Sequence, residues 1–164
     1  MKILLTSLSI AAMIGLSGCG GSGDSSAVTT SKLKGTWEGS CINLPDATSE
    51  KTILVFEKEK FTRSSFQYSD IGCNKEDNTD DMDVYYSYEL GDDVNTEDGK
   101  KATKISSTIT GFLLKKGNLT NGNIPQAGTV EKGIVLIDND KLYRGEDKVP
   151  YKLNYQQYLQ KVKK

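Results

Sequence analysis

About eight short segments of this chain are rich in β-branched and aromatic residues, and turn-forming residues separate them. In the clearest segment, 84–90, an apolar or aromatic residue occupies every second position, so these side chains share one face of a strand. The other expected strands are 33–42, 52–56, 61–68, 101–115 with an interruption at Gly111, 129–137 and 141–144. This succession predicts an all-β domain, built as an antiparallel barrel or sandwich.

The segment 61–68 departs from simple alternation. Phe66 and Tyr68 fall on one face of this strand, whereas Phe61 has the opposite parity. A residue inserted into one strand of a pair changes the face to which the following side chains point. We therefore expect a β-bulge or a change of register between Phe61 and Phe66.

The C-terminal segment has a different period. Tyr155, Tyr158, Leu159 and Val162 follow the spacing i, i+3, i+4, i+7, which is typical of one face of a helix. Asn154 precedes them as a residue suited to an N-cap, and lysines follow where the helix dipole favours positive charge. The sequence therefore predicts a short C-terminal α-helix that packs on the sheet.

The N-terminus has the pattern of a signal peptide. Lys2 is followed by an apolar run of about 14 residues, shorter than the roughly 20 that a membrane span needs. The run ends in Leu16-Ser17-Gly18-Cys19, which resembles the lipobox of bacterial lipoproteins. The resemblance implies a signal peptide at 1–18 and a lipidated Cys19 that anchors the protein in a membrane. The alternative is an ordinary cleaved signal with a chance cysteine.

The residue after the lipobox is Gly20 rather than Asp. In Gram-negative members of the lipoprotein family this implies the outer membrane, with the protein facing the periplasm or the cell surface. Residues 19–31 are rich in Gly, Ser and Thr and are expected to be the lipidated cysteine and a flexible tether. The remainder, 32–164, is long enough for one domain with a single core.

Two cysteines remain once Cys19 is assigned to lipid. Cys41 and Cys73 form an even pair in an oxidising compartment, and we expect them to form a disulfide. Two free thiols are the alternative. A metal site is less favoured because the chain has no histidine and no fourth cysteine to complete it.

Composition excludes several functions. The net charge of −1 argues against nucleic-acid binding, and the absence of histidine excludes Ser-His-Asp and Cys-His catalysis. The acidic segments 77–83 and 93–99 offer oxygen atoms to calcium, but they lack the EF-hand pattern and are expected to be solvated loops. A pair of carboxylates for glycoside hydrolysis stays open, since no pair stands out. We therefore expect no enzyme activity, catalytic residue, cofactor or metal.

Gly35-Thr36-Trp37, at the head of the first expected strand, resembles the Gly-x-Trp motif of lipocalins. The resemblance implies a small up-and-down antiparallel barrel of about eight strands that ends in a helix. It also implies that Trp37 closes the barrel floor and that a late basic residue packs over it. Arg144 is the candidate, and such a cation–π contact contributes about 0.5–2 kcal/mol.

A lipocalin-like barrel implies a small hydrophobic or amphipathic ligand. Tyr86 and Tyr88, together with Phe66 and Tyr68, are the candidate pocket residues because tyrosine offers an apolar ring and a hydroxyl group. The alternative is a barrel filled by side chains that acts as a protein-interaction, assembly or inhibitor module of the cell envelope. An eight-stranded barrel allows either, since its interior is just wide enough to be filled or to hold one small ligand.

Overall fold

The structure is a computed structural model that describes residues 27–77, 81–115 and 124–163. The lipobox resemblance at 16–19, with Cys19, lies outside the described residues. So does the middle of the acidic segment 77–83. Among the described residues, no helix has the length and apolar character needed to cross a membrane.

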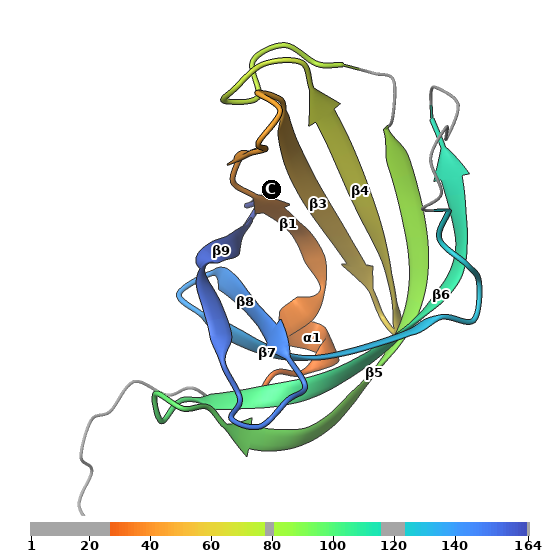
Figure 1. The fold of residues 1–164 in the computed structure, drawn as a ribbon. Helices are drawn as coiled ribbons and strands as arrows, with labels where there is room; N and C mark the ends of the chain where they lie inside the picture. Colours follow the sequence, from red (N-terminus) through yellow and green to blue (C-terminus); the bar gives the residue numbers. More distant parts are fainter. Residues whose placement is uncertain (1–26, 78–80, 116–123, 164) are drawn as a thin grey trace, which may run out of the picture.

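Eight antiparallel strands close into a barrel, as the sequence predicts (Figure 1). Each strand pairs with the next, and the last strand, β9, pairs with the first, β1, which also pairs with β3. A short additional strand, β2, pairs with β3 alone. In chain order the strands are β1 (Gly35–Gly39), β2 (Ile42–Asn43), β3 (Ser49–Glu57), β4 (Lys60–Tyr68), β5 (Met82–Asn95), β6 (Lys101–Leu114), β7 (Val130–Asp138), β8 (Lys141–Glu146) and β9 (Leu153–Lys161).

Turn chemistry fixes the connections at one end of the barrel. Asn139 and Asp140 join β7 to β8, and both have positive φ, 50° and 61°. Two successive residues in this conformation make the two-residue turn whose twist matches a β-hairpin, and Asn and Asp tolerate it better than most residues. The pairing of Asp138 with Lys141 then sets the register of the whole hairpin.

A short helix, α1 (Thr30–Leu33), closes this same end of the barrel, which we call the closed end. Thr29 caps the helix by accepting a hydrogen bond from the Lys32 amide, 3.3 Å away. Leu33 and Val28 are both buried. Val28 was expected to lie in the flexible tether, and Leu33 was expected to begin the first strand. The folded domain therefore begins a few residues before residue 32. The opposite end, where β1 and β4 finish, is called the loop end.

The main core lies in the closed half of the barrel. Its buried residues come from α1 and from strands on every side of the barrel, so burial of their apolar surface stabilises closure itself. They are Val28, Leu33, Trp37, Leu54, Phe56, Tyr88, Val135, Leu142 and Leu159. A second, smaller core of Ala102, Ile134, Leu136 and Leu153 covers the outer face of β7.

The predicted C-terminal helix is wrong, because residues 153–161 form β9. Part of the helix signal is real: the Asn154 side chain accepts hydrogen bonds from the amides of Gln156 and Gln157, at 3.1 and 3.2 Å. These contacts make a local turn within the strand, and the strand then continues against β1. The unpaired edges of β1 and β8 would otherwise carry open hydrogen-bonding groups, so pairing overrides the local helical preference.

The expected bulge in 61–68 is also wrong. β4 pairs with β3 in an unbroken register from Lys60 to Tyr68. Odd and even positions of β4 point to opposite faces of the sheet. Phe61 therefore packs inside the barrel against Tyr86, and Phe66 lies on the outer face. A strand with apolar residues on both faces is compatible with a small barrel whose outer face is partly covered.

Candidate functional site

A disulfide between Cys41 and Cys73 confirms the predicted pair. It joins the segment after β1 to the connection after β4, at the loop end, with the two Cα atoms 5.9 Å apart. Ser49 supports the same connection, since its hydroxyl donates to the Asp70 carbonyl at 2.6 Å and accepts from the Cys73 amide at 3.1 Å. The disulfide therefore holds one of the loops at the barrel opening.

Trp37 lies at the closed end, but its cationic partner is not the predicted Arg144. The Lys161 ammonium lies 4.9 Å from the centre of the Trp37 ring. The indole Nε1 donates to the Leu33 carbonyl at 2.6 Å, and Lys161 donates to the Lys32 carbonyl at 3.0 Å. Lys161 of β9 is the backbone partner of Trp37 of β1, so closure of the barrel places this lysine over the ring. Arg144 was the predicted partner because the segment that contains Lys161 was expected to be a helix.

An inner cavity of about 130 Å³ lies between the core and the loop end. One part of its wall is apolar, formed by Leu54, Phe56, Phe61, Ile105 and Leu142. The other part is polar, formed by Arg63, Tyr86, Ser107, Glu131, Lys132 and Arg144. The cavity therefore places an apolar surface and a charged surface within the reach of one small molecule.

The cavity contains both arginines of the chain. Arg63 on β4 lies opposite Leu54 on β3, and Arg144 on β8 lies opposite Val135 on β7. Residues directly opposite each other in antiparallel strands share a face, and Leu54 and Val135 belong to the core. Both arginine side chains consequently project from opposite walls toward the barrel interior.

The two guanidinium groups influence each other. Burial lowers the pKa of Arg144, and the positive charge of Arg63 lowers it further, whereas Glu131 acts in the opposite direction. The Arg144 side chain is nevertheless exposed to solvent, because it also lines the β8–β9 groove. Among the described residues, neither arginine has a carboxylate within the 4.0 Å of an ion pair.

Tyr86 connects the apolar and charged walls. Its ring stacks on Phe61 with centroids 4.4 Å apart, and the Arg63 guanidinium carbon lies 5.4 Å from the ring centre. Its hydroxyl donates to Glu131 Oε1 at 3.4 Å. Burial raises the pKa of Tyr86 to about 12, and the charge of Arg63 opposes this rise in part. The hydroxyl thus stays a hydrogen-bond donor at neutral pH.

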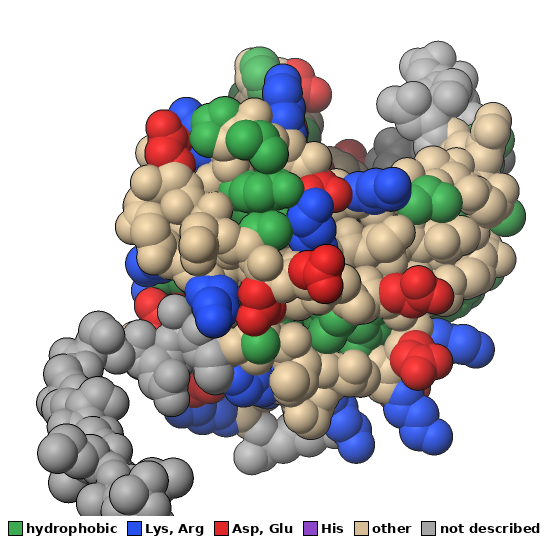
Figure 2. Space-filling model, turned by 90° about the horizontal axis from the view of Figure 1, so that it is seen from below, with side chains coloured by type: hydrophobic (Ala, Val, Ile, Leu, Met, Phe, Trp, Pro, Cys, Tyr) green, Lys and Arg blue, Asp and Glu red, His purple; other side chains and the backbone are tan. Residues whose placement is uncertain are grey.

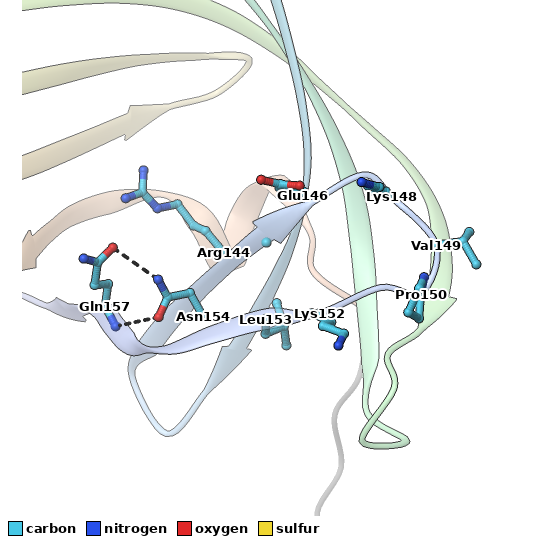
Figure 3. Close-up of a pocket in the computed structure, with 10 residues that line it drawn as sticks. Arg144, Glu146, Lys148, Val149, Pro150, Lys152, Leu153, Asn154 and Gln157 are labelled. Carbon is cyan, nitrogen blue, oxygen red and sulfur yellow. Dashed lines mark hydrogen bonds between the residues drawn. The ribbon is translucent and has the colours of Figure 1, made fainter.

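A larger groove of about 740 Å³ adjoins the cavity along the β8–β9 hairpin (Figure 3). Arg144 and Gly145 line both spaces. Figure 3 shows the Arg144 side chain extending from β8, with Asn154 and Gln157 on β9 beside it and hydrogen-bonded to each other at 3.2 Å. Glu146, Lys148, Val149, Pro150, Lys152 and Leu153 complete the groove. Arg144 therefore marks the junction of the two spaces.

Of the four predicted pocket residues, Tyr86 lines the inner cavity. Tyr88 belongs to the core, and its hydroxyl donates to the Lys58 carbonyl at 2.5 Å. Phe66 and Tyr68 point away from the cavity; the Lys115 ammonium lies 5.3 Å from the Phe66 ring centre. Sequence reasoning missed Arg63, although its parity with Phe61, two residues earlier, was the available signal.

The acidic segments show no metal-binding arrangement in the described part of the chain, where no three metal-binding side chains come together. In 93–99 the carboxylates are engaged: Asp93 accepts from the Thr103 hydroxyl at 2.8 Å, and Asp98 accepts from Thr96 and Tyr155. On the face seen in Figure 2, positive and negative side chains are interspersed.

No protein-family model matches the chain. No curated protein matches it either.

Proposed function

We propose that this protein is a membrane-anchored extracytoplasmic lipoprotein whose barrel binds a small hydrophobic or amphipathic ligand. The single observation that carries the binding proposal is the inner cavity, which shares Arg144 and Gly145 with the β8–β9 groove. The lipobox resemblance at 16–19 carries the proposal that Cys19 is acylated and that the protein lies in the outer membrane. Acyl chains contribute about 0.8 kcal/mol per buried CH₂ group, so several chains on one residue give stable anchoring.

The distribution of side chains along the barrel supports a ligand at the loop end. The closed half holds the buried side chains of Trp37, Leu33 and the other core residues. The cavity begins beyond Phe56 and Phe61, whose rings face it. Ligand sites are typically concave and mainly apolar, with a few convergent polar groups, and this wall has that composition.

The two volumes limit the ligand. The inner cavity of about 130 Å³ is smaller than the roughly 300–1,000 Å³ of common ligand sites, whereas the groove of about 740 Å³ falls within that range. We infer that a ligand inserts one small apolar part into the cavity and extends across Arg144 into the groove.

A binding role is favoured over catalysis. The chain has no histidine, and Cys41 and Cys73 are joined in a disulfide. Among the described residues, Glu131 is the one carboxylate that lines the inner cavity, and it is solvent-exposed. Paired carboxylates or an activated nucleophile, which hydrolytic chemistry uses, are not assembled in this wall.

The test measures saturable binding of a hydrophobic fluorescent dye to the full chain. Ile105→Trp on β6 fills the inner cavity and should abolish saturable dye binding. Leu113→Trp on the same strand places the same side chain at a position that is 52 % exposed and serves as the matched control. Equal dye binding by both variants, or no saturable binding by the unsubstituted protein, would contradict the proposal.

The second candidate is a protein-interaction module of the envelope. Exposed apolar side chains at the end of β6 and the start of β7, namely Phe112, Leu113 and Val130, favour it, because such groups often mark contact surfaces. In that case the unsubstituted protein should not bind the dye in its cavity, and Leu113→Asp should reduce capture of an envelope partner. Dye binding that Ile105→Trp removes would favour the ligand role instead.

A further inference from the structure

We infer that Arg63 and Arg144 form a subsite for an oxyanion, a carboxylate or a phosphate, at the junction of the inner cavity and the β8–β9 groove. The ligand class is then an amphipathic anion with a small apolar group. This inference rests on the proposed function, because it specifies the polar end of the ligand of the same cavity.

The first argument is the placement of the arginines. The chain has 21 lysine and arginine residues, of which two are arginines, and both line this one cavity. Arginine binds carboxylate and phosphate through a planar fork of donors, which a lysine ammonium cannot reproduce. Lysine serves at the outer surface, in ion pairs such as Lys104 with Asp147 and Lys163 with Asp140.

The second argument is the charge of the cavity wall. Arg63 and Arg144 contribute positive charge, whereas the Lys132 side chain shares the outer face of β7 with Ile134. Among the described residues of the wall, Glu131 alone contributes negative charge. Within the described chain, Glu131 makes no ion pair with either arginine and accepts instead from the Tyr86 hydroxyl at 3.4 Å. Two like charges that share a confined space repel, and an anion placed between them relieves this repulsion.

The third argument is that further donors surround the arginines. The Ser107 hydroxyl lines the same wall, beside the Tyr86 hydroxyl that donates to Glu131. Asn154 and Gln157 bring amide groups to the groove beside Arg144. An oxyanion has more acceptor sites than one guanidinium can satisfy, so such a set of donors suits it.

The apolar wall sets the orientation of the ligand. Leu54, Phe56 and Phe61 lie on the core side of the arginines, where they can contact a short apolar group. The oxyanion then lies at the Arg63–Arg144 level, and the remainder of a longer ligand follows the groove outward.

The experiment is calorimetric titration of the full chain in lipid nanodiscs, with empty nanodiscs as the blank. The ligands share one short chain and differ in their head group: hexanoate, hexyl phosphate, hexanol and hexylammonium, with inorganic phosphate alone as a further probe. We expect the two anions to bind at least about tenfold more tightly than hexanol, and hexylammonium to bind least, because charge-assisted hydrogen bonds are stronger than neutral ones. The tighter of the two anions identifies carboxylate or phosphate.

The variants are Arg63→Met and Arg144→Met, each expected to remove the preference for anions while hexanol binding persists. Lys163→Met, which removes an exposed cation at the closed end, is the control and should change nothing. Arg63→Lys and Arg144→Lys keep the charge but lose the fork, and they should lose part of the preference. These two variants also keep the test valid if a methionine variant fails to fold, which near-ultraviolet circular dichroism reports.

Equal binding of hexanol and the anions, unaffected by either arginine substitution, would overturn the subsite and leave the ligand-binding proposal intact. No binding of any chain-bearing probe to folded protein would overturn both. Inorganic phosphate bound as tightly as hexyl phosphate would support the anion subsite and overturn the amphipathic class of ligand.

Discussion

The Lys161 ammonium lies 4.9 Å from the centre of the Trp37 ring, so a residue of the last strand covers the indole of the first strand. The two residues are also backbone partners across the β1–β9 closure. Lys161 also donates a hydrogen bond to the Lys32 carbonyl of α1, so one side chain of β9 contacts both α1 and β1 at the closed end.

The first prediction concerns this contact. Lys161→Met should lower the free energy of unfolding by about 1–2 kcal/mol, because it removes a cation–π contact and a hydrogen bond to a carbonyl. Chemical denaturation of the full chain measures this change. Lys141→Met is the matched control, since it removes a cation that lies 4.2 Å from the Tyr158 ring on the outer face of β8, and it should cost less. An unchanged midpoint for Lys161→Met would contradict the role of this residue in closure.

The second prediction separates Lys161 from Arg144. Arg144→Met should leave the free energy of unfolding within about 0.5 kcal/mol of its starting value, or raise it, because the arginine makes no ion pair with the described residues and lies near Arg63. The lowered pKa means that the fold disfavours the charged form at neutral pH, where Arg144 is fully protonated. A large loss of stability in the same denaturation assay would indicate a structural role, as the lipocalin resemblance first suggested.

The third prediction concerns the disulfide. Replacing Cys41 and Cys73 together by alanine should lower the free energy of unfolding by about 3–4 kcal/mol, since the bond closes a loop with a sequence separation of 32 residues. Ser49→Ala, which removes the hydrogen bonds of the same connection, should cost less, about 1–2 kcal/mol. A double-cysteine variant as stable as the oxidised protein would be inconsistent with this assignment.

The fourth prediction concerns high pH. The folded pKa of Tyr86, about 12, lies above the ordinary value of 10.0, so the fold favours the protonated hydroxyl. Its contribution to stability is complete below pH 10 and is lost as the pH rises from about 10 to 12. Tyr86→Phe should therefore weaken the decline of the melting temperature over this range. Tyr85→Phe, on the opposite face of β5, should leave the decline as it is; the reverse pattern would contradict the burial of Tyr86.

The fifth prediction concerns Gly145, at the edge of the groove. A Cβ atom there would lie 2.0 Å from the Lys152 carbonyl oxygen, so β8 and β9 could not keep their spacing. Gly145→Ala should cost about 1–3 kcal/mol and shift the residues that line the groove. Gly111→Ala, whose nearest neighbour would be 3.9 Å away, is the control. Thermal melting distinguishes the two, and equal stability would argue against this close approach.

Local patterns predicted β1 and β3 to β8 because each of these strands carries its own signal. The segment 84–90 alternates as predicted, and Tyr86 reaches the cavity for that reason. The pairing of Cys41 with Cys73 followed from the compartment that the N-terminus implies.

The errors arose where distant parts of the chain decide the outcome. The local sequence predicts Asn154 as the N-cap of a helix, whereas in the structure it caps a turn within β9, because the segment pairs with the edges of β1 and β8. Because this segment is a strand and not a helix, Lys161 lies over Trp37, and Arg144 lines the cavity instead. The partnership of Arg144 with Arg63 depends on which strands face each other across the barrel, and no local pattern contains that information.

The most direct measurement for the central claim is native mass spectrometry of the full chain purified from its own cell envelope. The account predicts a bound small molecule that is released on denaturation, ionises as an anion, and is missing from Ile105→Trp. A protein that carries no releasable mass, or one that carries the same mass after the cavity is filled, would contradict ligand binding inside the barrel.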